Sequence, residues 1–189
     1  VKGEHYSFDN GYFPTRGRST SFSYEWVYGG FPHGIGTFHS LQLSSRAVHG
    51  TEHLAFLPSV DLRYLVGDDI PVPFINVMGG LLPGRYLDQQ IPFVGLGNLV
   101  AMHNILGVVG GEFRLRLTTN NYLSLMGNFA VSANDFSDFE NTGNGNFMTV
   151  GGLGVQYAYN SIIGPLKANL GWSTLTRRVG LYLGVGFDF

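Results

Sequence analysis

The last part of the chain, residues 179–189, carries an apolar side chain at every second position. The apolar members are Val179, Leu181, Leu183, Val185, Phe187 and Phe189. The residues between them are Gly180, Tyr182, Gly184, Gly186 and Asp188. A period of two is that of a β-strand with one apolar face. Because the other face is small or polar, the pattern is typical of a terminal strand in a transmembrane β-barrel.

The same period recurs along the chain and predicts further strands. The predicted segments are residues 18–28, 37–48, 54–66, 107–118, 122–133, 147–160, 165–173 and 179–189. Backbone polar groups within a bilayer all need partners, so an open half-barrel is not viable in lipid. We therefore predict an all-β fold, a single transmembrane antiparallel β-barrel of about eight strands over residues 1–189. One or two further strands are expected if residues 1–8 also pair.

One face of each predicted strand is expected to meet lipid and the other the barrel lumen. The lipid-facing set is Phe22, Trp26, Leu41, Leu62, Leu115, Leu125, Val155, Leu183 and Phe187, with Tyr24, Tyr64, Tyr157 and Trp172 nearer the interfaces. The inward charged set is Glu25, Arg46, Asp61, Arg63, Glu112, Arg114, Arg116, Lys167 and Asp188. Side chains fill the lumen of a narrow barrel. We therefore expect these opposite charges to pair as a buried network.

The connections between the predicted strands alternate in length, as they do in outer-membrane barrels. Residues 118–121 and 161–165 are short turns. Residues 134–146, rich in Asn, Asp, Ser and Gly, suit an external loop. The longest connection, residues 67–106, exceeds what a hairpin needs, and a loop of that size in a compact domain is usually functional. We expect it to fold inward before the chain enters the next strand.

Composition and charge narrow the class of protein. The 189 residues suffice for one domain, and 28 glycines, 15 Phe and 10 Tyr accompany only 13% charged residues. The chain has no cysteine, which excludes disulfides and thiolate metal sites. A net charge of −2 gives no reason to expect nucleic acid as a partner. No basic-then-apolar leader begins at Val1, so we expect a mature form or a fragment.

Residues 89–111 carry no formal charge over a length that could suggest a transmembrane helix. Pro92, five glycines and several polar residues interrupt this stretch. Since such residues disfavour a helix, we predict a loop followed by a strand.

Candidate catalytic or metal-binding residues are few. The histidines that cluster in the sequence are His33, His39, His49 and His53. No two of them have the spacing and facing of a ligand pair, so we predict neither a metal site nor a cofactor. Small barrels also include lipid-modifying enzymes, and His39 beside Ser40, or His49 near Ser44 and Ser45, would be the candidates for that alternative function. Adjacent strand residues face opposite sides, so His39 and Ser40 cannot form a dyad directly.

Several stretches, taken in order, resemble the barrels of the Omp85 superfamily, which includes the assembly factor BamA and the patatin-like PlpD proteins. The first is DNGYFPTRG at residues 9–17, with the signature residues Phe13, Pro14, Arg16 and Gly17. The others are Gly79-Gly80, Gly84-Arg85-Tyr86, GGEFRL at residues 110–115, IGPL at 163–166 and GFDF at 186–189. Residues 90–95 and 121–123 are most similar to barrels of patatin-like proteins from Bacteroidota.

The resemblance covers the second half of the sixteen-stranded family barrel. It implies that the long connection is the family's inward-folded loop, whose arginine packs against acidic residues on the next two strands. At the matching positions Arg85, followed by Tyr86, would reach Glu112 and Asn128. The family motif has its glycine after the arginine, whereas here Gly84 precedes Arg85. A buried Arg85–Glu112 pair is physically reasonable because a desolvated arginine needs a partner.

The resemblance also implies a location and a function. Phe187 and Phe189 match the family's terminal signal for insertion into the outer membrane. The Gly-x-Ser-x-Gly turn of a patatin nucleophile does not occur in the chain, so phospholipase activity is not carried over. We predict a non-enzymatic barrel in the outer membrane of a Gram-negative bacterium, which serves protein assembly or translocation or anchors a partner. The expected partners are outer-membrane lipid and either a second copy of the chain or another membrane protein.

Overall fold

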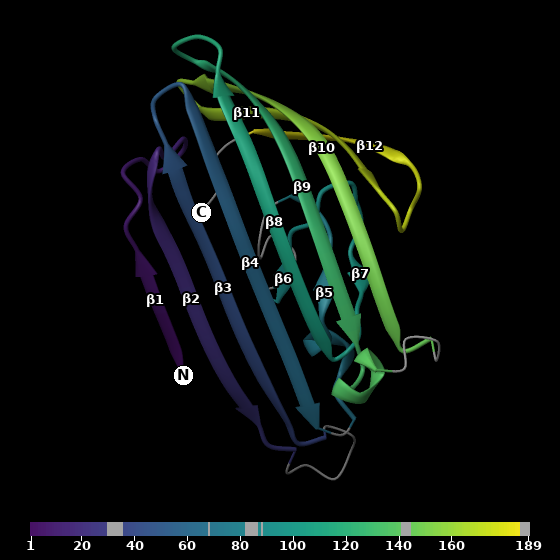
Figure 1. Ribbon diagram of the computed structural model, residues 1–189. Helices are drawn as coiled ribbons and strands as arrows, with labels where there is room; N and C mark the ends of the chain where they lie inside the picture. Colours follow the sequence, from purple (N-terminus) through teal and green to yellow (C-terminus); the bar gives the residue numbers. More distant parts are fainter. Residues whose placement is uncertain (30–35, 68, 82–86, 88, 141–144, 186–189) are drawn as a thin grey trace.

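The computed structural model describes residues 1–29, 36–67, 69–81, 87, 89–140 and 145–185. Most of these residues form one strongly curved sheet of nine strands (Figure 1). Its strands, in spatial order, are β1 (Lys2–Tyr6), β2 (Arg16–Val27), β3 (Phe38–Gly50), β4 (Leu54–Gly67), β8 (Ile105–Arg116), β9 (Asn121–Ala133), β10 (Phe147–Ser161), β11 (Gly164–Ser173) and β12 (Val179–Val185). Neighbouring strands all pair antiparallel. Among the described residues, no helix is long and apolar enough to cross a membrane.

The predicted all-β antiparallel fold is confirmed. Each of the eight segments with a period of two contains one long strand of the sheet. The first residues add β1, which pairs with β2 from Lys2 opposite Ser23 to Tyr6 opposite Ser19. In the part of the chain that the structure describes, β1 and β12 are the two edges of the sheet and no ladder joins them. Closure into a barrel therefore stays a prediction.

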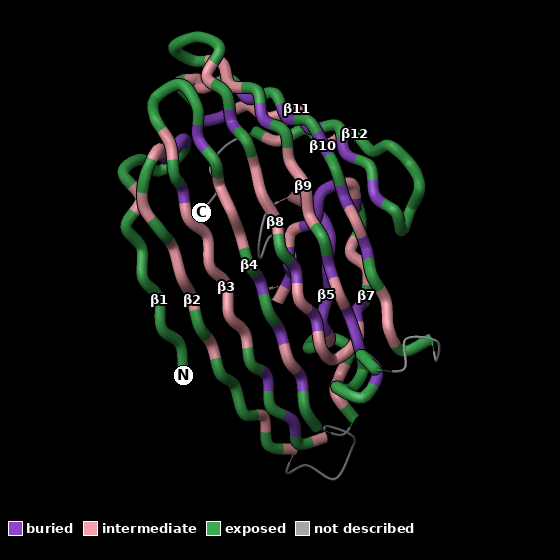
Figure 2. Tube along the Cα trace, in the orientation of Figure 1, coloured by how far each residue is buried: buried purple, intermediate pink, exposed green. Residues whose placement is uncertain are grey.

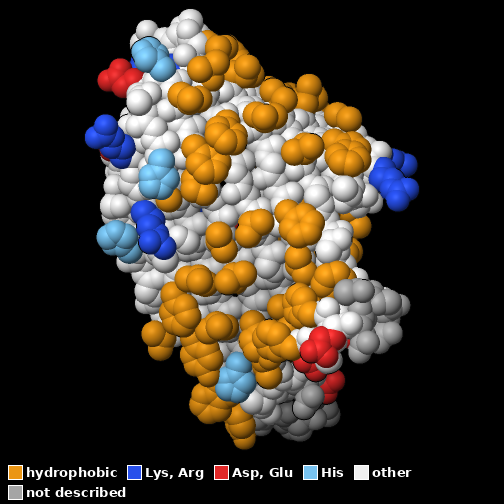
Figure 3. Space-filling model, in the orientation of Figure 1, with side chains coloured by type: hydrophobic (Ala, Val, Ile, Leu, Met, Phe, Trp, Pro, Cys, Tyr) orange, Lys and Arg blue, Asp and Glu red, His pale blue; other side chains and the backbone are white. Residues whose placement is uncertain are grey.

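Exposure alternates along the strands as the sequence period requires. In β10, every residue from Gly152 to Ala158 switches between buried and exposed, as the alternating colours in Figure 2 show. On the convex face Leu125 is 57% exposed, whereas its neighbour Ser124 on the concave face is 2% exposed. Hydrophobic side chains are spread across the convex face (Figure 3). Exposed apolar side chains on a regular sheet are those that lipid would cover.

The two ends of the sheet carry different connections. At one end, called the turn end below, the connections are residues 7–15, 51–53, 117–120 and 162–163. At the other, the loop end, they are residues 28–37, 68–104, 134–146 and 174–178. The predicted alternation of short and long connections is therefore present, and in barrels of this kind the short turns face the periplasm.

The longest connection enters the concave side of the sheet. It contains the 3-10 helix η1 (Val72–Phe74) and the short strands β5 (Val77–Met78), β6 (Gln90–Ile91) and β7 (Val100–Ala101). These strands form a small sheet in the order β6-β5-β7, seen behind β8 to β10 in Figure 1. We call the described residues 76–81, 87 and 89–104 the inner segment.

The inner segment supplies half of a hydrophobic core, and the concave wall supplies the rest. Its buried side chains are Met78, Ile91, Phe93, Leu96 and Met102. They pack against Leu106 and Val108 of β8, Ala130 of β9 and Val150 of β10. Apolar residues on the inward face of these strands are therefore covered by the inner segment and shielded from water. A lumen filled with water would favour polar residues at the same positions.

Candidate functional site

The inner segment lies directly on the backbone of β10 and β11, at positions occupied by glycine. A Cβ atom added to Gly152 would lie 2.3 Å from the carbonyl oxygen of Val94, and one added to Gly154 would lie 2.5 Å from Val94 Cγ1. At Gly171 it would lie 2.7 Å from the nitrogen of Gly95. These separations are far below van der Waals contact, so a side chain at any of these positions would force the inner segment to shift. We call Gly152, Gly154 and Gly171 the glycine groove.

Gly95 completes this contact from the segment's side. Its φ angle is +82°, a conformation that favours glycine, and an added Cβ would lie 2.3 Å from the carbonyl carbon of Trp172. Backbone therefore meets backbone at Gly95 and at the Val94 carbonyl, while the side chains of Phe93 and Val94 lie against the glycine groove beside these contacts. The period of two along residues 147–160 and 165–173 places these glycines on the inward face of β10 and β11. Nothing in the sequence indicates what they accommodate.

Polar side chains of the wall bind the backbone of the inner segment. Asn128 Oδ1 accepts a hydrogen bond from the Val94 nitrogen at 3.2 Å. Arg63, only 5% exposed, donates from Nη1 to the carbonyl oxygen of Gln89 and from Nη2 to Ser40 Oγ, both at 3.0 Å. Ser132 Oγ accepts from the nitrogen of His103 at 2.9 Å. Each bond satisfies a polar group that the core has taken out of water.

The predicted contact of Arg85 cannot be placed, because Arg85 and Tyr86 lie outside the described residues. Of the two positions expected to receive the arginine, Glu112 accepts a hydrogen bond from Ser124 Oγ at 2.6 Å, and Asn128 binds Val94. The Arg85–Glu112 pair therefore stays a prediction. Phe187 and Phe189, the expected insertion signal, also lie outside the described residues.

The signature stretch at residues 9–17 is a turn closed by its own side chains. Asp9 Oδ1 accepts from the nitrogens of Thr15 and Arg16 at 2.9 and 3.2 Å, and Asp9 Oδ2 accepts from the Thr15 hydroxyl at 2.6 Å. The Thr15 hydroxyl is the main cause that lowers the pKa of Asp9 to about 2. Asn10 Oδ1 accepts from the nitrogens of Tyr12 and Phe13. These bonds fix the course of the turn.

Phe13 is the anchor of this turn. Its ring stacks on Tyr122 with centroids 3.9 Å apart and planes 8° from parallel, and the guanidinium of Arg114 lies 5.6 Å from its centroid. The ring is 7% exposed. Arg114 Nη2 also donates to the carbonyl oxygen of Pro14. The turn is therefore held at the turn end of β8 and β9 by one aromatic stack, one cation–π contact and one charged hydrogen bond.

The other two signature residues have different roles. Gly17 has a φ of +119°, and a Cβ atom there would lie 2.4 Å from the carbonyl oxygen of Ser7. Arg16 contributes its backbone nitrogen to Asp9, while its side chain is exposed. Sequence comparison identified the signature residues. It did not connect the turn with Arg114, expected only as an inward charge, or with Tyr122, which lie about a hundred positions later and meet the turn only in the folded sheet.

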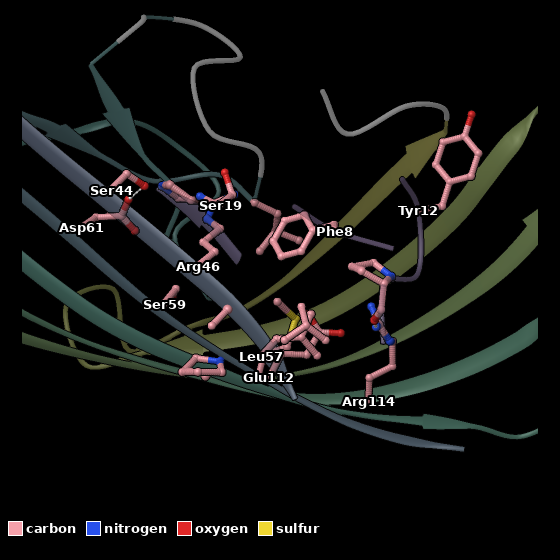
Figure 4. Close-up of a pocket in the computed structure, with 18 of the residues that line it drawn as sticks. Phe8, Tyr12, Ser19, Ser44, Arg46, Leu57, Ser59, Asp61, Glu112 and Arg114 are labelled. Carbon is pink, nitrogen blue, oxygen red and sulfur yellow. Dashed lines mark hydrogen bonds between the residues drawn. The ribbon is translucent and has the colours of Figure 1, made fainter. Parts of the chain in front are cut away.

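A cavity of about 650 Å³ remains between the turn end of the wall and the inner segment. Phe8 and Tyr12 of the β1–β2 connection, Arg46 of β3, Asp61 of β4 and Glu112 of β8 line it (Figure 4). Phe93 and Val94 form part of the opposite wall. The cavity therefore combines both signs of charge with aromatic surface.

Four of the inward charges, of which Asp61, Glu112 and Arg114 line this cavity, bind hydroxyls and carbonyl oxygens. Asp61 accepts from Ser44 Oγ at 2.5 Å, Glu112 binds Ser124 as described, and Arg63 and Arg114 donate to carbonyl oxygens. The salt bridges in the described part of the chain are Lys2–Glu4 and Arg116–Glu52, and neither involves these four. Among the described residues these four groups therefore bind neutral partners, and the predicted network of opposite charges, which also includes Arg85 and Asp188 outside the described residues, stays a prediction. Neutral partners satisfy a buried charge when their geometry is good.

The residues considered for a lipid-modifying enzyme lie apart. His39 is on the convex face, where Nδ1 is 2.8 Å from the Tyr24 hydroxyl. Ser40 is 5% exposed on the concave face and binds Arg63. His49 and Ser45 share the convex face but are four residues apart, or roughly 13 Å along a strand. Within the described residues, no group of three or more His, Asp and Glu side chains could hold a metal ion.

Comparison with known proteins places these features in a family. The family described as the OMP85 superfamily matches residues 3–189, nearly the whole chain. No curated protein matches the chain. The resemblance inferred from the sequence motifs is confirmed at the level of the superfamily. The finer likeness to BamA, PlpD and patatin-like barrels stays a prediction.

Proposed function

The chain belongs to the OMP85 superfamily, whose members are outer-membrane proteins. We propose on this basis that it is a non-enzymatic membrane element through which proteins are assembled into, or moved across, the outer membrane. In this role the inner segment is a plug that moves from the glycine groove when a substrate protein enters the lumen. Anchoring of a partner, the other role expected from the sequence, needs no such movement.

The observation that carries the proposal is the way the inner segment docks. Its shortest contacts with Gly152 and Gly171 are backbone against backbone, and its hydrogen bonds to Arg63 and Asn128 join wall side chains to its own backbone. A surface that recognises backbone is largely independent of side-chain identity. It would therefore suit the exchange of one extended segment for another.

The non-enzymatic part of the proposal rests on the placement of the candidate nucleophiles. Ser40 and Ser44 bind Arg63 and Asp61, and His39 lies on the opposite face of β3. A serine nucleophile requires a base within hydrogen-bond reach. The described geometry offers these serines no imidazole.

A reversible lock on the inner segment tests the proposal. The chain has no cysteine, so Val94→Cys with Gly154→Cys introduces a single disulfide. The Gly154 Cβ position lies 2.5 Å from Val94 Cγ1, which is too short for unbonded atoms but is close to the separation that a bond between the two sulfurs sets. The control is Leu125→Cys with Val155→Cys, a directly opposed pair on the convex face. Both proteins are placed in phospholipid vesicles, and insertion of an unfolded outer-membrane protein is followed by gel mobility.

With the oxidised lock, we expect insertion of the unfolded test protein to fall to the level seen in vesicles that lack the barrel protein. Reduction of the disulfide should restore insertion. The control should be active in both states. If the oxidised lock inserts the test protein as well as the control does, the inner segment is no moving plug and the anchoring role takes its place.

A further inference from the structure

A cationic cluster lies on the convex face of the sheet near the turn end of β1 to β3. Arg16 and Arg18 have the same strand parity as Phe22 and Trp26, which are 42% and 62% exposed. In the ladder with β3, Arg16 lies opposite His49. His5 of β1 adds another exposed imidazole on this face. We call His5, Arg16, Arg18 and His49 the cationic patch.

The neighbouring strands show that this patch interrupts an apolar surface. The row that begins with Arg16 and His49 continues to Phe56 of β4 and then to Phe113 of β8. The two phenyl rings stack 4.6 Å apart and are 37% and 55% exposed. In Figure 3, Lys, Arg and His side chains gather along one edge of the face beside the hydrophobic surface. Lipid acyl chains by themselves would make an unfavourable environment for these charged side chains, because charge in contact with hydrocarbon is costly.

The patch is built as a donor site. Arg16, Arg18 and His49 line a shallow pocket together with Ser7 and Gly50. Ser45 Oγ orients the Arg18 guanidinium, accepting from Nε at 3.3 Å and from Nη2 at 3.2 Å. In the described chain neither arginine has a carboxylate within salt-bridge distance. A positioned guanidinium with donors left over matches the oxygens of a phosphate group.

We propose that the cationic patch binds the phosphate of an anionic phospholipid headgroup in the leaflet at the turn end. Arg18 is the third residue of β2 and His49 the last but one of β3. The patch is therefore only about 7 Å along the strand from the sheet's end, which is the level of headgroups. The acyl chains of the same lipid would lie on the stacked rings of Phe56 and Phe113. This inference depends on the membrane location and not on the proposed movement of protein.

Native mass spectrometry of the protein in a neutral detergent tests this site. Phosphatidylglycerol and phosphatidylcholine with the same acyl chains are titrated separately. The variant is R16Q/R18Q, and the matched control is R177Q/R178Q, which removes two exposed arginines from the β11–β12 connection at the loop end. R16K/R18K keeps the charge but removes the planar donor fork.

We expect the unchanged protein and the R177Q/R178Q control to retain phosphatidylglycerol in preference to phosphatidylcholine. R16Q/R18Q should lose the preference, and R16K/R18K should lose part of it. The lipid assignment would be overturned by equal retention of both lipids, by an equal loss in the control, or by a dimer that R16Q/R18Q dissociates. A dimer of that kind would identify the patch as an interface between two copies of the chain.

Discussion

The glycine groove gives the most direct test of how the inner segment is held. In Gly152→Ala, the new Cβ would lie 2.3 Å from the Val94 carbonyl oxygen and 2.7 Å from Phe93 Cε1. The oxygen belongs to the backbone, so the inner segment has to shift to relieve the clash. Overpacking of this kind costs about 1–3 kcal/mol. That is the expected loss in the free energy of unfolding.

Whether the inner segment also leaves the groove depends on what holds it there. Met78, Ile91, Phe93 and Leu96 are each at most 2% exposed. At about 1.5–3 kcal/mol for each buried side chain, docking contributes up to roughly 6–12 kcal/mol. One alanine should therefore displace the inner segment without releasing it. Three valines, at Gly152, Gly154 and Gly171 together, would cost about 3–9 kcal/mol at the same cost per site, which is comparable with this energy, and should raise the population of the released state.

Urea unfolding in phospholipid vesicles measures the loss of stability, and hydrogen exchange of residues 89–102 measures release. The matched control is Gly180→Ala, since its Cβ would have no neighbour closer than the Gly171 oxygen at 4.0 Å. That change should be neutral or slightly stabilising, because alanine restricts the unfolded chain. If Gly152→Ala unfolds at the same urea concentration as Gly180→Ala, the proposed backbone contact is not what holds the inner segment.

Four further results are expected. Phe13→Ala should destabilise the sheet by about 3–5 kcal/mol because the ring is buried between Tyr122 and Arg114, and a loss no larger than that of the lipid-facing Phe22→Ala in urea unfolding would contradict this. The folded-state pKa of Asp9, about 2, is below its ordinary value of 3.8, so its stabilising effect is fully present above pH 3.8 and is lost as the pH falls through about 2. A carbon NMR titration of the Asp9 carboxyl with a midpoint near 3.8 would contradict the hydrogen bonds from Thr15 and Arg16. Leu183→Arg should destabilise the membrane-folded state by about 2–4 kcal/mol if Leu183 lies at mid-depth in the bilayer. Gln42 lines the cavity, so Gln42→Arg should not have this effect. Equal yields of folded protein for the two variants would contradict the assignment of faces. Arg85→Gln and Glu112→Gln should each cost about 3–5 kcal/mol if the two charges are buried together, and the double variant should recover part of the loss, so additive effects in urea unfolding would rule out the pair.

The sequence by itself determined the strands and their faces. A period of two is a property of each strand alone, so Leu125 could be assigned outward and Ser124 inward without any knowledge of the neighbours. The superfamily could also be recognised in advance, because its motifs retain their order along the chain. The same local reasoning predicted that residues 67–106 are more than a hairpin connection, since length alone carries that information.

Only the tertiary structure decided what these residues meet. The bond from Arg114 to Pro14 and the stack of Phe13 on Tyr122 join positions about a hundred residues apart, and no local pattern encodes such a pairing. The hydroxyls and carbonyl oxygens that bind Asp61, Arg63 and Glu112 were not predictable for the same reason. A period gives the face of a side chain but not the group that lies across from it. The glycine groove is the clearest case. A glycine in a strand is compatible with a bulge, a bend or a close approach, and only the backbone of Val94 and Gly95 lying against β10 and β11 shows that close approach is the reason.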